Sequence, residues 1–244
     1  MTAPTTDVLG LAGARVLVTG AAGGIGSAVV AAFRGAGSTV LATDVASGDR
    51  VLPADLTSES QVERLMAAAG PVDHLVHAAG VVVTGSLAQT TPTEFRRVLE
   101  INLVSGFLLA RCASPAIRPG GSITFIASQG ARKGGALWSA YCASKFGLIG
   151  LSESLAQELA PQSVRVNAVC PGVVDTPVTR RLLDDLASQR ASTAPAERQR
   201  YLGRIPMGRL ADPSEIANVC VMLASSLSSY VTGASLVVDG GELS

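Results

Sequence analysis

The stretch Thr19-Gly20-Ala21-Ala22-Gly23-Gly24-Ile25-Gly26 decides the fold of this chain. It follows the short apolar run Arg15–Thr19, which predicts a strand, and it leads into Gly26–Gly35, where apolar residues recur at helical spacing. Glycine permits the sharp turn that such a junction needs and lets another group approach the backbone closely. The free N–H groups and the positive dipole at the start of the helix are suited to binding phosphate. The stretch therefore predicts a phosphate-binding turn between a strand and a helix.

The same alternation of strand and helix continues through the chain. We expect strands at Arg15–Thr19, Thr39–Thr43, Asp73–His77, Ser122–Ala127, Val164–Val169 and Ser235–Val238, with a further strand just before Asp55. We expect helices at Gly26–Gly35, Glu59–Ala69, Thr93–Ser114, Tyr141–Ala160 and Pro213–Ser225. Repeated units of this kind predict an α/β fold with a doubly wound parallel sheet of about seven strands and helices on both faces.

Length and composition indicate a single domain. The chain has 244 residues, of which 48% are hydrophobic and only 4% aromatic, so its core must consist of aliphatic side chains. No change of composition, linker or repeat marks a second domain, and we expect one domain over residues 1–244 with an N-terminal extension at 1–13. The segment 175–205 carries many charges and no expected strand. A segment of this length inside a compact domain predicts a lid over the substrate.

Charge and cysteine content argue against several classes of protein. Lysine plus arginine and aspartate plus glutamate both total 19, so no basic excess points to nucleic acid or to a membrane surface. The sequence has no leader-like segment and no uninterrupted apolar stretch of about 18 residues. Cys112, Cys142, Cys170 and Cys220 lie too far apart along the chain for a metal-site motif. We expect a cytoplasmic protein with reduced cysteines, no metal and a small-molecule partner.

Asp44 lies at the end of the second expected strand, eighteen residues after Gly26. An acidic side chain at this place can accept hydrogen bonds from the adenosine ribose hydroxyls of a dinucleotide. A 2′-phosphate beside it would meet a like charge, at a cost of about 1–4 kcal/mol. The glycine loop has no Lys or Arg to offset that cost. The arrangement therefore favours NAD(H) over NADP(H).

Ser128, Tyr141 and Lys145 form the candidate catalytic set. Ser128 ends a strand, and Tyr141 and Lys145 are four residues apart, so a helix places them on one face. Hydride transfer at a carbinol needs a proton acceptor at the oxygen, but tyrosine with a pKa of about 10 is mostly protonated near neutrality. A lysine ammonium and a positive nicotinamide ring would move that pKa towards 7, which takes roughly 4 kcal/mol. Ser128 would bind and orient the substrate oxygen.

The spacing Gly20-x-x-x-Gly24-x-Gly26, together with Ser128 and Tyr141-x-x-x-Lys145, resembles that of the classical short-chain dehydrogenases/reductases (SDRs). The resemblance extends from Arg15 to the ending Val238-Asp239-Gly240-Gly241. It implies a Rossmann-type fold and a nicotinamide cofactor that exchanges a hydride with the substrate. The residues implied to contact the cofactor are Gly20, Ala22, Gly23, Gly24, Ile25, Gly26, Asp44, Asp55, Leu56, Ala78, Ala79, Gly80, Tyr141, Lys145, Pro171, Val174 and Thr176.

Three further positions are interpreted through this resemblance. Asn102 matches a family asparagine that supports a proton relay, which implies a catalytic role. His77 and Ala78 replace both asparagines of the family's N-N-A-G segment, and we expect His77 to be structural. In Pro171-Gly172-Val173-Val174-Asp175-Thr176, the Val174 backbone and the Thr176 hydroxyl would hold the nicotinamide carboxamide.

Residues next to the catalytic set are candidates for binding the substrate. They are Ser128, Gln129, Ala131, Trp138 and Tyr141, together with the 175–205 segment. Their mostly small or apolar character suggests a cyclic or medium-sized alcohol or ketone. Arg132 and Lys133 lie near the expected entrance and could serve a carboxylate or a phosphopantetheine, although a solvated loop explains them equally well.

The leading hypothesis is an NAD(H)-dependent dehydrogenase of a secondary alcohol, with Tyr141 as general acid/base. The first alternative is an NADPH-dependent reductase of 3-oxoacyl thioesters on acyl carrier protein. A non-enzymatic, nucleotide-sensing regulator is a further alternative, which would not need Ser128, Tyr141 and Lys145 in register. The helix of Tyr141 also carries Leu148, Leu151, Leu155 and Leu159, which predicts pairing of such helices in a homotetramer.

Overall fold

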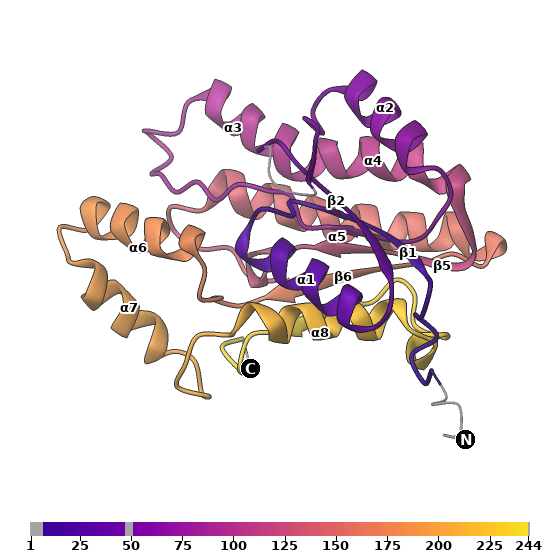
Figure 1. Cartoon of the computed structure of the whole chain (residues 1–244). Coiled ribbons are helices and arrows are strands. Elements are labelled where there is room, and N and C mark those ends of the chain that lie inside the picture. The colour runs from indigo at the N-terminus through magenta and orange to yellow at the C-terminus, as the bar shows by residue number, and fades with distance from the viewer. Residues whose placement is uncertain (1–6, 47–50, 244) are drawn as a thin grey trace.

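The computed structural model describes residues 7–46 and 51–243, and within them seven strands form one sheet in the order β3-β2-β1-β4-β5-β6-β7 (Figure 1). All neighbouring strands run parallel. The strands are β1 Arg15–Thr19, β2 Thr39–Asp44, β3 Val51–Pro53, β4 Val72–His77, β5 Ile117–Ile126, β6 Arg165–Pro171 and β7 Ser235–Val238. The order changes direction between β1 and β4, and such a switch point leaves a crevice beyond the strands' carboxyl ends. The predicted doubly wound sheet is confirmed.

Helices cover both faces of this sheet. The helical elements are α1 Gly24–Gly35, α2 Glu59–Ala69, α3 Pro92–Leu99, η1 Glu100–Val104, α4 Ser105–Ala113, η2 Ser114–Ala116, η3 Gln129–Ala131, α5 Ser139–Leu159, η4 Ala160–Gln162, α6 Pro177–Gln189, α7 Ala194–Leu202, α8 Pro213–Ala224 and η5 Ser226–Ser228. Figure 1 shows α2, α4 and α5 on one side of the sheet and α1 and α8 on the other. Helices α6 and α7 form a pair at one end of the molecule (Figure 1).

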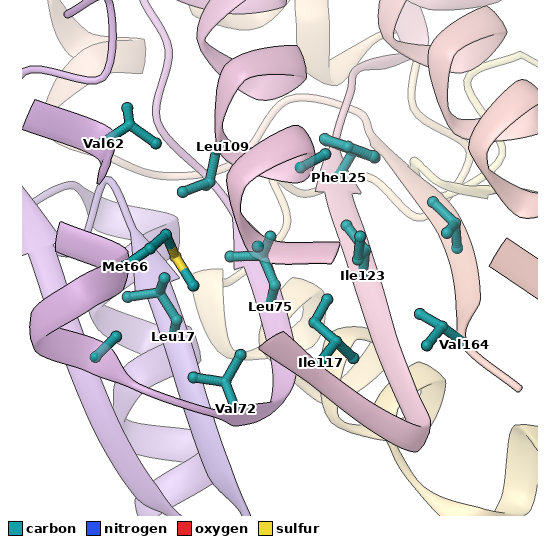
Figure 2. Packing of buried hydrophobic residues seen from close by; sticks show 14 of the residues in the cluster. Leu17, Val62, Met66, Val72, Leu75, Leu109, Ile117, Ile123, Phe125 and Val164 are labelled. Carbon is teal, nitrogen blue, oxygen red and sulfur yellow. The ribbon is translucent and has the colours of Figure 1, made fainter. Parts of the chain in front are cut away.

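The alternation of side chains along each strand divides the core into two layers. In β1, Leu17 packs with the side chains of α2 and α4, whereas Val16 and Val18 pack with those of α1 and α8. Figure 2 shows the first layer, where Leu17 and Phe125 are among the fully buried side chains. Burying one such side chain stabilises the fold by about 1.5–3 kcal/mol. A sheet packed on both faces holds the ends of its strands in fixed positions.

The predicted helix Thr93–Ser114 is interrupted. Helix α3 passes into a π-helical turn, η1, and then into α4, so the run is not one regular helix as expected. Its N-terminus is capped by Thr91, whose side chain accepts a hydrogen bond from the N–H of Glu94. Asn102 lies in the π turn and is fully buried. Such turns often occur at functional sites, because the extra residue turns a side chain away from the regular register.

The run Pro92–Ala116 is long and apolar enough by composition to cross a membrane. Its apolar side chains are used in the core, however. Val98, Leu109 and Ala113 are completely buried, and Leu109 and Ala113 pack with residues of the sheet and of α2. Packing against the sheet therefore accounts for the hydropathy of this run.

Two expectations about segments are refined. The 175–205 segment is not irregular, because it contains the two helices α6 and α7, joined through a small cluster of Leu183, Leu186 and Tyr201. Of the proposed N-terminal extension 1–13, residues 1–6 lie outside the described part of the chain. Residues 7–13 include Leu11, which is completely buried in the α1/α8 layer. The described part of the extension is thus attached to the core.

The four leucines of α5, from which helix pairing between subunits was expected, differ in burial. Leu148 and Leu159 are buried in the core, and Leu151 and Leu155 are partly buried against it. A helix that covers a sheet needs about this much apolar surface. Packing on the sheet therefore accounts for Leu148 and Leu159, whereas Leu151 and Leu155 are only partly covered by it.

Candidate active site

A cavity of about 1370 Å³ lies at the carboxyl ends of the strands, where the switch point predicted a crevice. A typical small-molecule pocket has about 300–1,000 Å³, so this one has room for a dinucleotide and a substrate together. All the residues expected to contact cofactor or substrate line it, except Ala131 and Asn102. Ala131 is buried in a small core cluster below the cavity, so its expected role in the substrate pocket is wrong.

The glycine loop fits a dinucleotide phosphate. Gly20 has a φ of +63°, and a Cβ on Gly26 would lie 2.0 Å from the carbonyl oxygen of Gly20, so neither position accepts a larger residue without strain. Helix α1 begins after Gly23, which offers no side-chain cap, and its first turn holds no acidic residue. The N–H groups of that turn therefore face the cavity without a competing carboxylate.

Asp44 connects the end of β2 to the glycine loop. One carboxylate oxygen accepts a hydrogen bond from the N–H of Ala22 at 3.0 Å, and the other accepts one from Ala46 at 3.2 Å. Both bonds keep the carboxylate at the cavity wall. A negative charge is thus held next to the glycine loop, at the end of the cavity away from Tyr141.

The turn Ala78-Ala79-Gly80 is steadied by residues other than the family's asparagines. His77 is fully buried, with Nδ1 at 3.0 Å from the Thr19 hydroxyl oxygen, and that oxygen in turn accepts the N–H of Ala79. Burial, together with the nearby charge of Lys145, lowers the pKa of His77 to about 3. His77 is therefore neutral and has the geometry of a structural residue.

Asn102 does not reach the cavity. Its Oδ1 accepts the N–H of Val81 at 2.7 Å, and its Nδ2 donates to the carbonyl of Val81 at 3.0 Å and to the Ser144 hydroxyl at 3.0 Å. The side chain thus holds both backbone polar groups of Val81, the residue after Gly80. This arrangement makes Asn102 a clamp on the cavity floor, with its amide groups engaged inside the protein.

Ser128, Tyr141 and Lys145 come together at one end of the cavity. Ser128 follows β5 and caps η3, where its hydroxyl oxygen accepts the N–H of Gly130 at 3.0 Å. Tyr141 is in the first turn of α5, edge to face with Trp138 at 5.3 Å between ring centres. Lys145 follows one turn later, and its Nζ lies 5.8 Å from the centre of the Tyr141 ring. The helix therefore places the two side chains on one face, as the spacing predicts.

Burial dominates the ionisation of this pair. It raises the pKa of Tyr141 to about 12, against the opposing hydrogen bond of Ser128. It lowers the pKa of Lys145 to about 8, and Nζ donates a hydrogen bond to the carbonyl of Ile126 at 2.9 Å. The lowered Tyr141 pKa expected next to Lys145 is thus not found in the chain by itself. Both side chains favour their neutral forms more than they would in water.

The segment after β6 is also engaged with its own helix. Thr176 caps α6, with its hydroxyl oxygen accepting the N–H of Thr179 at 3.2 Å. The Thr179 hydroxyl donates to the carbonyl of Val174. A Cβ on Gly24 would lie 2.6 Å from the Thr176 methyl group, so the base of α6 packs directly on the glycine loop. Thr176 and Val174 line the cavity from there.

Several cavity residues went unnoticed in the sequence. From the 175–205 segment and the chain end, Arg181, Leu182, Arg190, Tyr201, Arg204 and Leu243 form a wall of the cavity, and Lys133 also lines it. Arg132 does not, contrary to the expectation that paired it with Lys133. The many charged residues of the 175–205 segment indicated a functional segment in the sequence, but they did not indicate which of its side chains line the cavity.

Comparisons with known proteins agree with this geometry. The family described as enoyl-(acyl carrier protein) reductase matches residues 20–242. Trans-4-hydroxycyclohexanecarboxylate dehydrogenase of Sinomonas cyclohexanicum is 40% identical over 174 residues, which are 71% of this chain and 61% of that protein. The 3-oxoacyl-[acyl-carrier-protein] reductase FabG of Escherichia coli K12 is 38% identical over 185 residues, which are 75% of this chain and 71% of that protein.

Solved structures are similar over almost the whole chain. A short chain dehydrogenase family protein from Francisella tularensis has a TM-score of 0.88 at 30% identity, covering 95% of this chain and 99% of its own. The aldohexose dehydrogenase of Thermoplasma acidophilum has a TM-score of 0.86 at 32% identity, covering 96% and 95%. With the family match, the sheet and the residues gathered at its carboxyl edge, this chain belongs to the classical short-chain dehydrogenase/reductase superfamily of oxidoreductases.

Proposed function

We propose that the protein is a cytoplasmic, NAD(H)-dependent dehydrogenase that interconverts a secondary alcohol and its ketone. The observation that carries this proposal is that Ser128, Tyr141 and Lys145 share one cavity with the glycine loop and Asp44. A proton-transfer group and a dinucleotide cradle at opposite ends of one cavity are what hydride transfer requires. The relatives named as dehydrogenases of trans-4-hydroxycyclohexanecarboxylate and of an aldohexose support an alcohol as substrate.

Ser128 and Tyr141 have different roles at the reacting oxygen. Because the Ser128 oxygen accepts the N–H of Gly130, its own proton is free to be donated to the substrate oxygen. The Tyr141 phenol then takes the carbinol proton in oxidation and returns it in reduction. A bound nicotinamide supplies the hydride acceptor or donor and, in its oxidised form, a positive charge.

Lys145 acts through its charge on Tyr141. A pKa of about 12 means that tyrosinate is disfavoured, and each pKa unit of correction requires about 1.4 kcal/mol. Protonated Lys145, held by the carbonyl of Ile126, has its Nζ 5.8 Å from the centre of the Tyr141 ring. Since the pKa of Lys145 is itself about 8, the ammonium form still predominates at neutral pH. Lys145 therefore favours the charged form of Tyr141 in the assembled site.

Asp44 supports the choice of NAD(H). Its carboxylate is fixed by two backbone N–H groups at the cavity wall, so it cannot swing away from a ribose placed next to the glycine loop. Ribose hydroxyls would satisfy its remaining lone pairs, whereas a 2′-phosphate would be repelled. The second candidate, an NADPH-dependent 3-oxoacyl thioester reductase, is favoured by the similarity to the FabG proteins.

We also propose a homotetramer. The outward surfaces of α4 and α5 carry Phe107 and Phe146, which are 44% and 47% exposed. Large aromatic side chains at such exposure are suited to helix pairing between identical subunits. The partly buried Leu151 and Leu155 of α5 lie on the same helix as Phe146 and could extend that contact.

The substitution Tyr141→Phe tests the mechanism. It keeps the packing against Trp138 but removes the oxygen that exchanges the proton, so turnover of a secondary alcohol with NAD should fall at least about a hundredfold. Binding of NADH, measured by its fluorescence, should stay within about threefold. Tyr230→Phe is the matched control, because Tyr230 is fully exposed. Near-normal turnover of Tyr141→Phe would contradict the assignment.

Cofactor preference separates the two candidate functions. The wild-type protein is assayed with NAD and NADP on a panel of cyclic and open-chain secondary alcohols, and with NADH and NADPH on a 3-oxoacyl thioester. The proposal expects a higher kcat/KM with NAD and an alcohol. A higher kcat/KM with NADPH and the thioester establishes the reductase instead.

A further inference from the structure

The wall of the cavity formed by the 175–205 segment is basic. Arg181, Arg190 and Arg204 line it, and Lys133 lines the cavity as well. In the described ranges, no Asp or Glu from α6, α7 or the chain end lines the cavity. The carboxylates of Glu197 and Glu242 do lie close to these arginines, but neither residue lines the cavity. Because the described residues of this wall present positive but no negative side chains to the cavity, the wall is suited to bind an anionic group.

Arg204 forms an ion pair with a buried glutamate. Its Nη2 is 2.7 Å from Oε1 of Glu242, whose side chain is only 1% exposed, while that of Arg204 is 64% exposed. The guanidinium also stacks over the ring of Tyr201, with 5.6 Å to the ring centre. An ion pair on one side and an aromatic face on another restrict Arg204 to few rotamers. The arginine is therefore oriented before any ligand arrives.

Glu242 also connects Arg204 to the catalytic set. Its Oε2 accepts a hydrogen bond from Nε2 of Gln129 at 3.0 Å, and Gln129 directly follows Ser128 in the chain. One carboxylate group thus separates the guanidinium of Arg204 from the residue next to Ser128.

Arg190 repeats the same arrangement. Its Nη1 is 2.7 Å from Oε2 of Glu197, and the other oxygen of Glu197 is 3.2 Å from Nη1 of Arg200. The Glu197 side chain is fully buried, which opposes its ionisation, but hydrogen bonds from Arg190 and Ser192 and the nearby arginine charges lower its pKa overall. Glu197 is therefore a charged group whose partner, Arg190, points into the cavity.

Buried carboxylates are costly to fold, because each loses its hydration. Here both form ion pairs with guanidinium groups that line the cavity. A guanidinium has five N–H donors arranged to bind a carboxylate or phosphate through two bonds at once. The nearby walls, formed by Trp138, Leu182, Tyr201 and Leu243, are mostly apolar. The wall therefore combines an apolar surface with fixed anion-binding groups.

We infer that Arg204, assisted by Arg190, binds an anionic group on the substrate, so that the substrate is a secondary alcohol with an apolar body and a carboxylate. This inference rests on the proposed function for the alcohol, but the anion site stands on the arginine geometry alone. The phosphate of a carrier-bound thioester has the same chemistry as a ligand. The experiment therefore has an arm for each source.

The first arm compares 4-hydroxycyclohexanecarboxylate with its methyl ester, which has the same body without the charge. In the wild-type protein, KM for the acid should be at least tenfold lower than KM for the ester. Arg204→Gln should raise KM for the acid at least tenfold and leave KM for the ester within about twofold. Arg204→Lys, which keeps the charge, should recover part of the loss. Arg198→Gln is the matched control, because Arg198 is exposed on α7 and does not line the cavity.

The second arm compares a 3-oxoacyl thioester of acyl carrier protein with the neutral N-acetylcysteamine thioester. If Arg204→Gln raises KM only for the carrier-bound substrate, the bound anion is the carrier's phosphate. That result overturns the proposal that the substrate is a free hydroxy acid. Equal effects of Arg204→Gln on charged and neutral substrates, in both arms, overturn the anion site itself.

A binding measurement keeps the two proposals distinguishable. Trp138 is the only tryptophan of the chain and lines the same cavity, so its fluorescence reports ligands there. Cyclohexanecarboxylate should change that fluorescence at concentrations at least tenfold lower than cyclohexanol does, and Arg204→Gln should remove this difference. This result with no turnover of any alcohol would support the anion site and contradict the proposed function. Equal responses to both probes would overturn the anion site.

Discussion

At the scale of single residues, the site differs from its family pattern in one informative place. His77 and Ala78 stand where the family has two asparagines, yet the turn they begin is fully held. The Thr19 hydroxyl, paired with His77, accepts the N–H of Ala79, and Asn102 binds both polar groups of Val81. The amides that the sequence lacks are thus replaced by groups from β1 and η1. A neutral histidine suffices there because its partners are hydroxyl groups rather than charges.

Asp44→Asn is expected to relax the preference for NAD. The amide keeps an oxygen to accept the N–H of Ala22, so the loop stays in place, but it no longer repels a 2′-phosphate. Removing about 1–3 kcal/mol of repulsion corresponds to a rise of about 5- to 150-fold in kcat/KM with NADP relative to NAD. Steady-state kinetics with both cofactors measure this ratio. Asp184→Asn on exposed α6 should leave it unchanged, and an unchanged ratio in Asp44→Asn would rule out a role of the charge.

At the scale of elements, the pair α6 and α7 has a core of its own. Leu183, Leu186 and Tyr201 form a cluster separate from the two layers that cover the sheet. The base of α6 is attached through Thr176, which packs on Gly24 of the glycine loop. Helices with a separate small core can loosen without unfolding the sheet. This is the behaviour required of a lid, which is the role we propose for the segment.

Leu186→Ala is expected to loosen this lid. Leu186 is completely buried, so its truncation leaves a cavity that costs about 2–5 kcal/mol within the small cluster. Hydrogen exchange should increase over residues 177–202, and KM for the substrate should rise severalfold while NADH binding changes little. The control is Leu223→Ala, equally buried under α8, which should lower Tm without a selective effect on KM. The same pattern of exchange in both variants would contradict a separate lid.

At the scale of the whole molecule, two buried histidines connect stability to pH. His74 in β4 pairs through Nδ1 with the Ser122 hydroxyl at 3.0 Å, and burial lowers its pKa to about 4 against the attraction of Asp73. His77, in the same strand, has a pKa of about 3. Both are neutral in the folded protein at pH values where an unfolded histidine, with a pKa of about 6.5, already binds a proton. The free energy of unfolding is therefore complete above pH 6.5 and falls as the pH decreases towards 4 and 3.

The free energy of unfolding should fall by up to about 2.8 kcal/mol per pH unit between pH 6 and pH 4.5, because each histidine contributes about 1.4 kcal/mol. Urea unfolding at several pH values in this range measures the slope. His74→Gln removes one of the two titrating groups and should halve it. His74 is the better residue to change, since it lies away from the cavity. An equal slope in the variant would show that other groups cause the acid sensitivity.

Much of the site could be predicted because its residues lie at strand ends. The glycine loop, Asp55 and Ser128 follow strands, and Asp44 and Pro171 are the last residues of strands. Parallel strands bring their carboxyl ends to one edge of the sheet. The π turn at Asn102 could not be predicted, because one extra residue in a helical turn leaves composition and approximate spacing unchanged. The pKa of Tyr141 could not be predicted either, because the burial of its side chain depends on neighbours from several elements.

The sequence by itself determined the order of strands and helices, the parallel sheet and the edge where the chemistry collects. Local periodicity and short connections leave few topologies, so these properties follow from residues close together in the chain. Only the tertiary structure decided that Glu242 joins Gln129, 113 residues away, to Arg204, and that arginines rather than glutamates face the cavity. The physical reason is that this wall is made by packing between α6, α7, η3 and the chain end. No local pattern encodes which side of a charged helix such packing turns inward.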